Sequence, residues 1–237
     1  MQLQTKALVI SSIKYGDTHL IVKCYTKEAG LKSYMLHHIL KSKKGPLKKA
    51  YFLPLMPLDL HVIHKNKGTL ERIKEARLLY PLKHLHQDPV KGALVLFLSD
   101  VLQQVLHEEP NVPLYEFLDY TVRFLDAATN VANIHLIFLL QLSTYLGCYP
   151  SQENKDLPYF NLQEGLFESQ ETPYSKKGAE VTVLKSLFGT NFDEVSALKI
   201  TKKERQNTLN LLLEFYQLHL QGFKKPASLH VLQQMFS

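Results

Sequence analysis

The chain has 237 residues, 45% of them hydrophobic, so it can form one large domain or two small ones around a buried core. Only two cysteines are present, Cys24 and Cys148, and the first residues lack the apolar run of a secretory leader. No apolar stretch is long enough to span a bilayer. These features argue against a disulfide scaffold and a membrane protein, and we expect a cytoplasmic location with both thiols reduced.

The formal net charge of +6 is unevenly distributed along the chain. Residues 1–80 hold 15 lysines and arginines against 5 acidic residues, whereas residues 81–237 hold 13 against 17. Such asymmetry predicts a basic module for nucleic acid or a membrane surface, followed by a module with a different role.

The first eighty residues have the pattern of β-strands separated by turn chemistry. Apolar alternation with a period of two, as in Leu58, Leu60 and Val62, is typical of a half-buried strand. A turn at 66–68 favours a strand after it, although Leu70 and Ile73 also fit helical spacing. Five short strands around a long loop predict an oligonucleotide-binding (OB) barrel over residues 1–80. The expected strands are 7–10, 19–26, 31–38, 51–64 and 70–78.

A basic loop lies between the third and fourth of these strands. Residues 41–49 read KSKKGPLKK, in which a Gly-Pro pair breaks both helix and strand. So many positive charges attract phosphate, whose neutralisation releases counterions, although a solvated loop without a ligand is the alternative. We expect the loop and neighbouring barrel lysines to track a nucleic acid backbone, through Lys14, Lys23, Lys27, Lys32, Lys41, Lys43, Lys44, Lys48 and Lys49. The aromatic residues that could stack on bases, or simply fill the core, are Tyr15, Tyr25, Tyr34, Tyr51 and Phe52.

From Asp88 the apolar period becomes helical. Asp88-Pro89 is a helix start, and Thr201 to Glu204 is a capping box. Residues 148–176 are rich in proline and polar residues, and predict an irregular insertion with a small hairpin at 159–162 and 165–167. The chain is therefore predicted to be α+β, with a helical domain over residues 81–237. Its expected helices are 90–109, 113–128, 134–146, 178–188, 201–220 and 228–236.

Catalytic motifs are missing from the sequence. There is no phosphate-binding glycine motif, no G-x-S-x-G, no H-E-x-x-H and no C-x-x-C. Ser11 to Lys14 matches S-x-x-K, but its partner motifs are missing. The histidine pairs have no cysteine or carboxylate nearby that would complete a metal site. We therefore expect no enzyme activity, no cofactor and no bound zinc. The pairs considered are His37-His38, His61/His64 and His84/His86.

Several segments together resemble the family of the bacterial DNA repair protein RecO. Lys6 to Ile10, Tyr15-Gly16-Asp17 and Tyr25 to Gly30 are similar to the family's opening strands and turns. The resemblance continues through Lys41-Ser42-Lys43-Lys44, Pro54 to Leu60, Tyr145 to Pro150, and a final pattern of Tyr216, His219, Gly222 and Ser228.

The chain departs from the family in one respect, because residues 150–176 lack the four zinc-finger cysteines that many members carry. For a member of this family the departure implies that packing of Tyr159, Phe160, Leu166 and Phe167 holds the insertion without metal.

The resemblance implies a recombination mediator that performs no covalent chemistry. Such a protein binds single- and double-stranded DNA, anneals complementary strands and acts with RecR. It helps RecA replace the single-stranded DNA-binding protein, whose acidic tail it binds on the helical domain, and it works at the bacterial nucleoid. The basic residues expected beside a tail pocket, unless they are ordinary surface residues, are Lys202, Lys203, Arg205, Lys224 and Lys225. The alternative function is an RNA-binding barrel without recombination partners, because backbone-led binding does not separate DNA from RNA.

Overall fold

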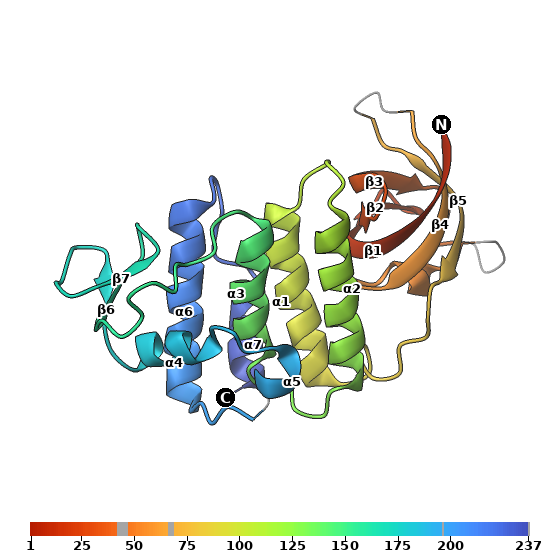
Figure 1. The fold of residues 1–237 in the computed structure, drawn as a ribbon. Coiled ribbons are helices and arrows are strands. Elements are labelled where there is room, and N and C mark those ends of the chain that lie inside the picture. Colours follow the sequence, from red (N-terminus) through yellow and green to blue (C-terminus); the bar gives the residue numbers. More distant parts are fainter. Residues whose placement is uncertain (42–46, 66–68, 196, 237) are drawn as a thin grey trace. The chain divides into compact units, whose positions relative to one another are not determined.

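The fold comes from a computed structural model, which describes residues 1–41, 47–65, 69–195 and 197–236 (Figure 1). The chain forms two compact units, Met1–Ala127 and Ala128–Ser237. The first contains a sheet and two helices, and the second contains the remaining helices and a small sheet. The turn expected at 66–68 lies outside the described residues.

Five antiparallel strands form the sheet of the first unit, in the order β3-β2-β1-β4-β5. The edge strands approach each other where a parallel bridge joins Tyr34 to Glu71, just before β5. This arrangement confirms the predicted five-stranded OB fold. The strands are β1 (Gln2–Tyr15), β2 (His19–Thr26), β3 (Gly30–Leu36), β4 (Pro57–Ile63) and β5 (Arg72–Leu78).

Alternating residues of these strands build the barrel core. Val9, Val22, Tyr34 and Leu60 are fully buried there, and the period of two explains why they share one face. The pairing of β1 with β2 shifts between Val9 and Ser11, which marks a β-bulge. A bulge increases local twist and bends the strand, as a small barrel requires.

The prediction of a strand over residues 51–64 was wrong for the first half of that range. Residues Lys49–Phe52 form a 3-10 helix, η1, and β4 begins only at Pro57. Between them Leu55 has a positive φ of 59°, a conformation that interrupts an extended strand. Pro54 beside it lacks the backbone N–H that a sheet ladder needs. The two prolines therefore mark a turn into the strand.

Helices α1 (Pro89–Val105) and α2 (Val112–Ala127) complete the first unit. Asp88 caps α1 by accepting hydrogen bonds from the N–H groups of Val90 and Lys91, as its position before a proline predicts. The β2–β3 turn packs directly on the segment between these helices. A Cβ on Gly30 would lie 2.2 Å from the carbonyl oxygen of Glu108, and its φ of 66° also favours glycine.

One carboxylate joins the end of α2 to the segment before α1. Asp126 accepts hydrogen bonds from the N–H groups of Lys83, His84 and Leu85. Burial alone would raise the pKa of Asp126, but these backbone hydrogen bonds outweigh it and hold the pKa below its usual value. The buried Lys91 side chain donates to the Asp126 carbonyl at 2.8 Å, so both helices are fixed at this corner.

The second unit is mostly helical. Thr201 and Glu204 form the predicted capping box at the start of α6. The buried Tyr216 hydroxyl donates to the carbonyl of Leu139 at 2.6 Å, which ties α6 to α3. No helix among the described residues combines the length and apolar character needed to cross a bilayer. The helices are α3 (Ile134–Tyr145), α4 (Ala179–Leu187), α5 (Phe192–Val195), α6 (Lys202–His219) and α7 (Leu229–Met235).

The insertion folds as a three-stranded sheet in the order β7-β6-β8, with β6 (Tyr159–Asn161), β7 (Leu166–Glu168) and β8 (Ser175–Lys176). Phe160 and Phe167 are buried with ring centroids 5.1 Å apart, as expected. Leu166, by contrast, is 37% exposed, so its expected packing role was wrong. Polar contacts contribute instead, because the Glu168 carboxylate accepts hydrogen bonds from Ser175, Thr172 and Asn161.

Candidate nucleic-acid interface

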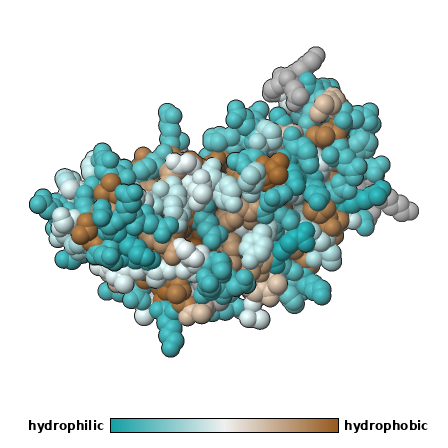
Figure 2. All heavy atoms as spheres, in the orientation of Figure 1, coloured by the Kyte–Doolittle hydropathy of each residue, from teal (hydrophilic) through white to brown (hydrophobic). Residues whose placement is uncertain are grey.

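The described part of the basic loop presents its lysines to solvent. Lys41, Lys48 and Lys49 are exposed, and Lys43 and Lys44 lie outside the described residues. The Lys48 amine lies 5.7 Å from the centre of the Tyr51 ring. Figure 2 shows a mainly hydrophilic surface over the strands, with a few separate hydrophobic patches. Exposed amines beside an aromatic ring can contact both a phosphate and a base.

The barrel lysines do not form one continuous track. Residues paired across antiparallel strands point to the same face of a sheet. Lys23 pairs with Ser11 and Ser33, whereas Lys32 pairs with the buried Cys24. Lys23 and Lys32 therefore lie on opposite faces of the sheet, so one strand of nucleic acid running along one face cannot contact both.

Two of the expected DNA contacts are already ion-paired. The Lys27 amine lies 2.9 Å from a carboxylate oxygen of Glu116, and the Lys32 amine lies 3.8 Å from one of Glu108. A phosphate would have to compete with these carboxylates. Exposed Lys14, at the end of β1, has no such ion pair among the described residues. Lys14 and the described loop lysines are therefore the stronger candidates for phosphate contacts.

The aromatic residues considered for base stacking differ in how deeply they are buried. Tyr25, Tyr34 and Phe52 are at most 2% exposed, so they belong to the core and not to a stacking surface. Tyr51 is half-buried, and Tyr15 is 55% exposed at the end of β1. Tyr15 is thus the one of the five with a ring face open to a base.

Three histidines gather beside Tyr15, a cluster that sequence reasoning missed. The ring centroid of His19 lies 5.2 Å from that of His37 and 4.9 Å from that of His38. The backbone N–H of His38 donates to Nδ1 of His19, and Thr18 Oγ1 lies within hydrogen-bond distance of both His19 Nε2 and His38 Nδ1. Burial, then the neighbouring imidazoles of His38 and His37, lower the pKa of His19. The lowered pKa favours the neutral form of His19 near neutral pH.

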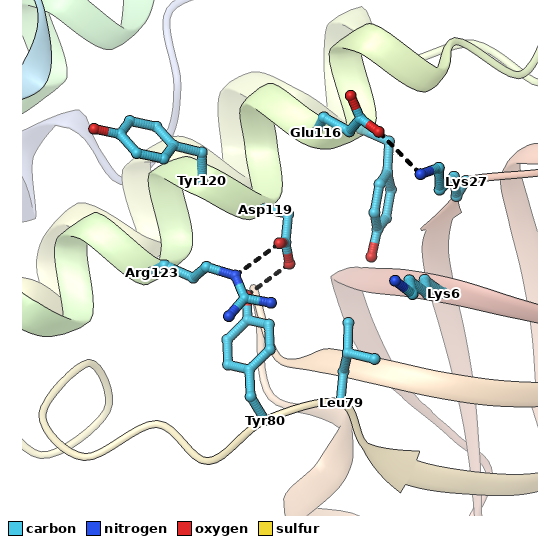
Figure 3. Close-up of a pocket in the computed structure, with 9 residues that line it drawn as sticks. Lys6, Lys27, Leu79, Tyr80, Glu116, Asp119, Tyr120 and Arg123 are labelled. Atoms are coloured by element: carbon cyan, nitrogen blue, oxygen red, sulfur yellow. Dashed lines mark hydrogen bonds and ion pairs between the residues drawn. The ribbon is translucent and has the colours of Figure 1, made fainter.

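A hollow of about 510 Å³ lies where the sheet meets α2 (Figure 3). The Arg123 guanidinium lies 3.5 Å from the centre of the Tyr80 ring and donates from Nε to Asp119 at 2.8 Å. The Tyr80 hydroxyl donates to the same carboxylate at 2.7 Å. Burial, together with this hydrogen bond, raises the pKa of Tyr80, so the hydroxyl keeps its proton. The residues lining the hollow are Lys6, Lys27, Leu79, Tyr80, Tyr115, Glu116, Asp119, Tyr120 and Arg123.

The residues expected to bind a partner tail lie in the second unit. Lys202, Lys203, Lys224 and Lys225 are exposed, whereas Arg205 is half-buried. The Arg205 guanidinium donates to the Asn133 side chain and lies 5.4 Å from the Phe236 ring. Arg205 borders a small apolar recess that is lined by Leu209, Leu232 and Phe236, and it is the basic candidate with an apolar neighbourhood.

One of the histidines considered for a metal site, His64, has a different contact. His64 is buried, and its Nε2 lies 2.8 Å from the Tyr34 hydroxyl. Within the described ranges, no group of three or more histidine, cysteine or acidic side chains could hold a metal ion. The expectation of a zinc-free protein remains a prediction for elemental analysis.

Comparison with known proteins identifies the family. The model for the Recombination protein O N terminal matches residues 1–82, and that for the Recombination protein O C terminal matches residues 86–228. Proteins named DNA repair protein RecO are 43% identical in Christiangramia forsetii, 43% in Flavobacterium psychrophilum and 44% in Flavobacterium johnsoniae. Each alignment covers 100% of both chains. The chain therefore belongs to the RecO family of DNA repair proteins.

Proposed function

We propose that this protein is a recombination mediator that binds single- and double-stranded DNA through its first unit and anneals complementary strands. Membership of the RecO family supports a role in DNA repair and recombination. The observation that carries the proposal is the group of exposed cations and one exposed aromatic on the barrel. Lys14 and Tyr15 lie at the end of β1, and Lys41, Lys48 and Lys49 lie on the basic loop.

Annealing needs no covalent catalysis, which fits a chain without catalytic motifs. Two complementary strands repel each other through their phosphates, and bound lysines reduce that repulsion. Lysines contact the phosphate backbone, and aromatic rings stack on the faces of the bases. Neither contact occupies the Watson–Crick edges of the bases. A surface with many lysines and few aromatics would therefore hold a strand in a state that can still pair.

We propose further that the second unit serves protein partners. In this account the protein acts with RecR, helps RecA replace the single-stranded DNA-binding protein, and binds the acidic tail of that protein near Arg205. The pairing of Arg205 with the Phe236 ring supports this site, because an acidic tail that ends in an aromatic residue needs a cation beside an apolar surface. Such a protein works at the nucleoid in the bacterial cytoplasm.

Strand annealing tests the proposed activity directly. Two complementary oligonucleotides with donor and acceptor dyes report pairing as energy transfer, and the protein should accelerate pairing. Replacing Tyr15 with alanine should slow annealing, because it removes a stacking surface worth about 1–3 kcal/mol per base. Tyr174→Ala is a matched control, since Tyr174 is 48% exposed in the second unit. No acceleration by the wild type would contradict the proposal.

An RNA-binding barrel without recombination partners is the competing function. The same lysines and the same stacking tyrosine would bind either polymer, because neither contact reads the 2′-hydroxyl. Annealing of oligoribonucleotides in parallel decides between the two. Faster annealing of RNA than of DNA, together with no binding to RecR, would favour the alternative.

A further inference from the structure

The hollow between the sheet and α2 contains three hydrogen-bond donors that its ion pairs do not use. Its two carboxylates are neutralised, since Glu116 pairs with Lys27 at 2.9 Å and Asp119 pairs with Arg123 at 2.8 Å. Lys6 lines the same hollow and has no ion pair among the described residues. Figure 3 shows its side chain reaching from β1 toward α2.

The second unused donor is the hydroxyl of Tyr115. Tyr115 is 2% exposed and lines the hollow, and its hydroxyl has no hydrogen-bond partner among the described residues. Leaving a buried polar group unpaired costs free energy, so an unpaired hydroxyl in a pocket indicates a missing acceptor. Burial, then the charges of Asp119 and Glu28, raise the pKa of Tyr115. The hydroxyl therefore keeps its proton and can donate it to a ligand.

The third donor group is the outer edge of the Arg123 guanidinium. Its Nε donates to Asp119, which leaves the two terminal nitrogens for a ligand. Stacking on Tyr80 holds the guanidinium plane in place. Planar guanidinium groups bind phosphate oxygens well, because their donors form a rigid fork.

We propose that this hollow binds a phosphate group of single-stranded DNA, with Lys6, Tyr115 and Arg123 as its donors. A volume of about 510 Å³ accommodates one nucleotide, and it lies within the usual range for ligand pockets. This inference rests on the proposed DNA binding and adds a contact outside the basic loop.

A phosphate fits the donor set better than a neutral ligand does. The two carboxylates of the hollow are already paired, so its three remaining donors favour an acceptor-rich group, and two of the three donors are positively charged. Nucleic acid is favoured over an acidic peptide because aromatic and guanidinium planes lie beside the donors, where a base can stack. Binding of an acidic peptide in place of DNA is the contrary outcome of the experiment below.

The decisive variant is Tyr115→Phe, because it removes one oxygen atom and leaves the ring. Since the hydroxyl has no hydrogen-bond partner within the part of the chain that the structure describes, its removal should leave the melting temperature unchanged or higher. Binding of a labelled oligothymidylate should nevertheless weaken, on the order of tenfold to a hundredfold for one hydrogen bond to a charged group. Gain or retention of stability together with loss of binding is typical of a functional group.

Tyr25→Phe is the matched control, since Tyr25 is equally buried but its hydroxyl donates to the carbonyl of Asn111. This control should lose stability and keep its affinity for DNA. Lys6→Ala should lower the slope of log affinity against log salt by about 0.7, the contribution of one single-strand phosphate contact. Lys83→Ala, at an exposed position elsewhere in the first unit, should leave the slope unchanged.

The outcomes separate this inference from the proposed function. If the wild type binds the oligonucleotide and Tyr115→Phe binds it equally well, the pocket is not a phosphate site, although the DNA-binding function stands. If the wild type does not bind, the proposed function itself fails. If an acidic peptide binds the wild type and loses affinity in Tyr115→Phe while DNA does not, the pocket belongs to a protein partner and the inference is overturned.

Discussion

Acid should destabilise the second unit through one buried histidine. His135 is 1% exposed on α3, with its ring stacked on Phe236 at 5.6 Å between centroids. Burial, then the positive charge of Arg205, lower the pKa of His135 to about 3. An unfolded histidine has a pKa of about 6.5. The folded state therefore excludes a proton that the unfolded state binds.

The sign and size of the effect follow from proton linkage. Stability from His135 is fully present above about pH 6.5 and falls as the pH drops toward about 3, because only the unfolded chain takes up the proton there. At about pH 5 the loss amounts to about 2 kcal/mol relative to neutral pH. This figure is a large fraction of the stability of a typical domain.

Urea unfolding of the wild type and of His135→Leu, followed by circular dichroism at several pH values, measures this loss. The leucine variant should lack the His135 part of the pH dependence, whatever its stability at neutral pH. Other histidines, such as His64 and His86, contribute equally to both proteins, so the difference between the two curves isolates His135. If the two proteins lose the same free energy between neutral pH and about pH 5, the neutral buried state of His135 is refuted.

Three further substitutions test the packing. Gly30→Ala should cost well over 1 kcal/mol in thermal unfolding, because its Cβ would meet the Glu108 carbonyl at 2.2 Å; an unchanged melting temperature would refute that contact. Tyr216→Phe should cost about 1 kcal/mol, because it removes the buried hydrogen bond to the Leu139 carbonyl; a cost near zero would contradict the hydrogen bond. Asp126→Ala should lower stability by about 2 kcal/mol, and Asp126→Asn by less, because the amide oxygen can still accept; equal costs would count against the capping role.

Local sequence signals predicted most elements of the fold. Period-two alternation predicted β2 at its observed bounds, and Asp88-Pro89 and Thr201 to Glu204 located the starts of two helices. These signals act within a few residues, so a single sequence displays them. The prediction of a strand over residues 51–56 was wrong for an equally local reason. Pro54 and the positive φ of Leu55 interrupt the strand despite the β-rich composition of this segment.

The candidate site was harder to predict, because it depends on contacts between distant residues. Lys27 and Lys32 are basic in sequence, yet Glu116 and Glu108 neutralise them in the structure. The register between β2 and β3 places Lys23 on the face of the sheet opposite Lys32. The sequence of a single strand does not reveal its register with a neighbouring strand.

The histidine cluster has a similar explanation. His19 and the pair His37-His38 meet only because β2 pairs with β3. The sequence could have drawn attention to it, since these histidines flank two adjacent predicted strands at the same end. The hollow beside α2 requires the packing of the helices on the sheet, for which no local pattern exists.

The salt dependence of single-stranded DNA binding tests the central claim most directly. Lys41, Lys48 and Lys49 are replaced together by alanine, and affinity for a fluorescent oligonucleotide is measured at several salt concentrations. The slope of log affinity against log salt should fall by about 2, since each phosphate contact on a single strand contributes about 0.7. Folding should be retained, because substitutions at exposed positions rarely cost much stability.

A charge-matched control carries alanine at Lys199, Lys202 and Lys203, which are exposed in the second unit. This control loses the same net charge, so it should show the slope of the wild type if the contacts are local to the barrel. A flattened slope in the loop variant alone is the result that this account predicts. Equal slopes in all three proteins would mean that the basic loop is only solvated surface, and the proposed DNA interface would be wrong.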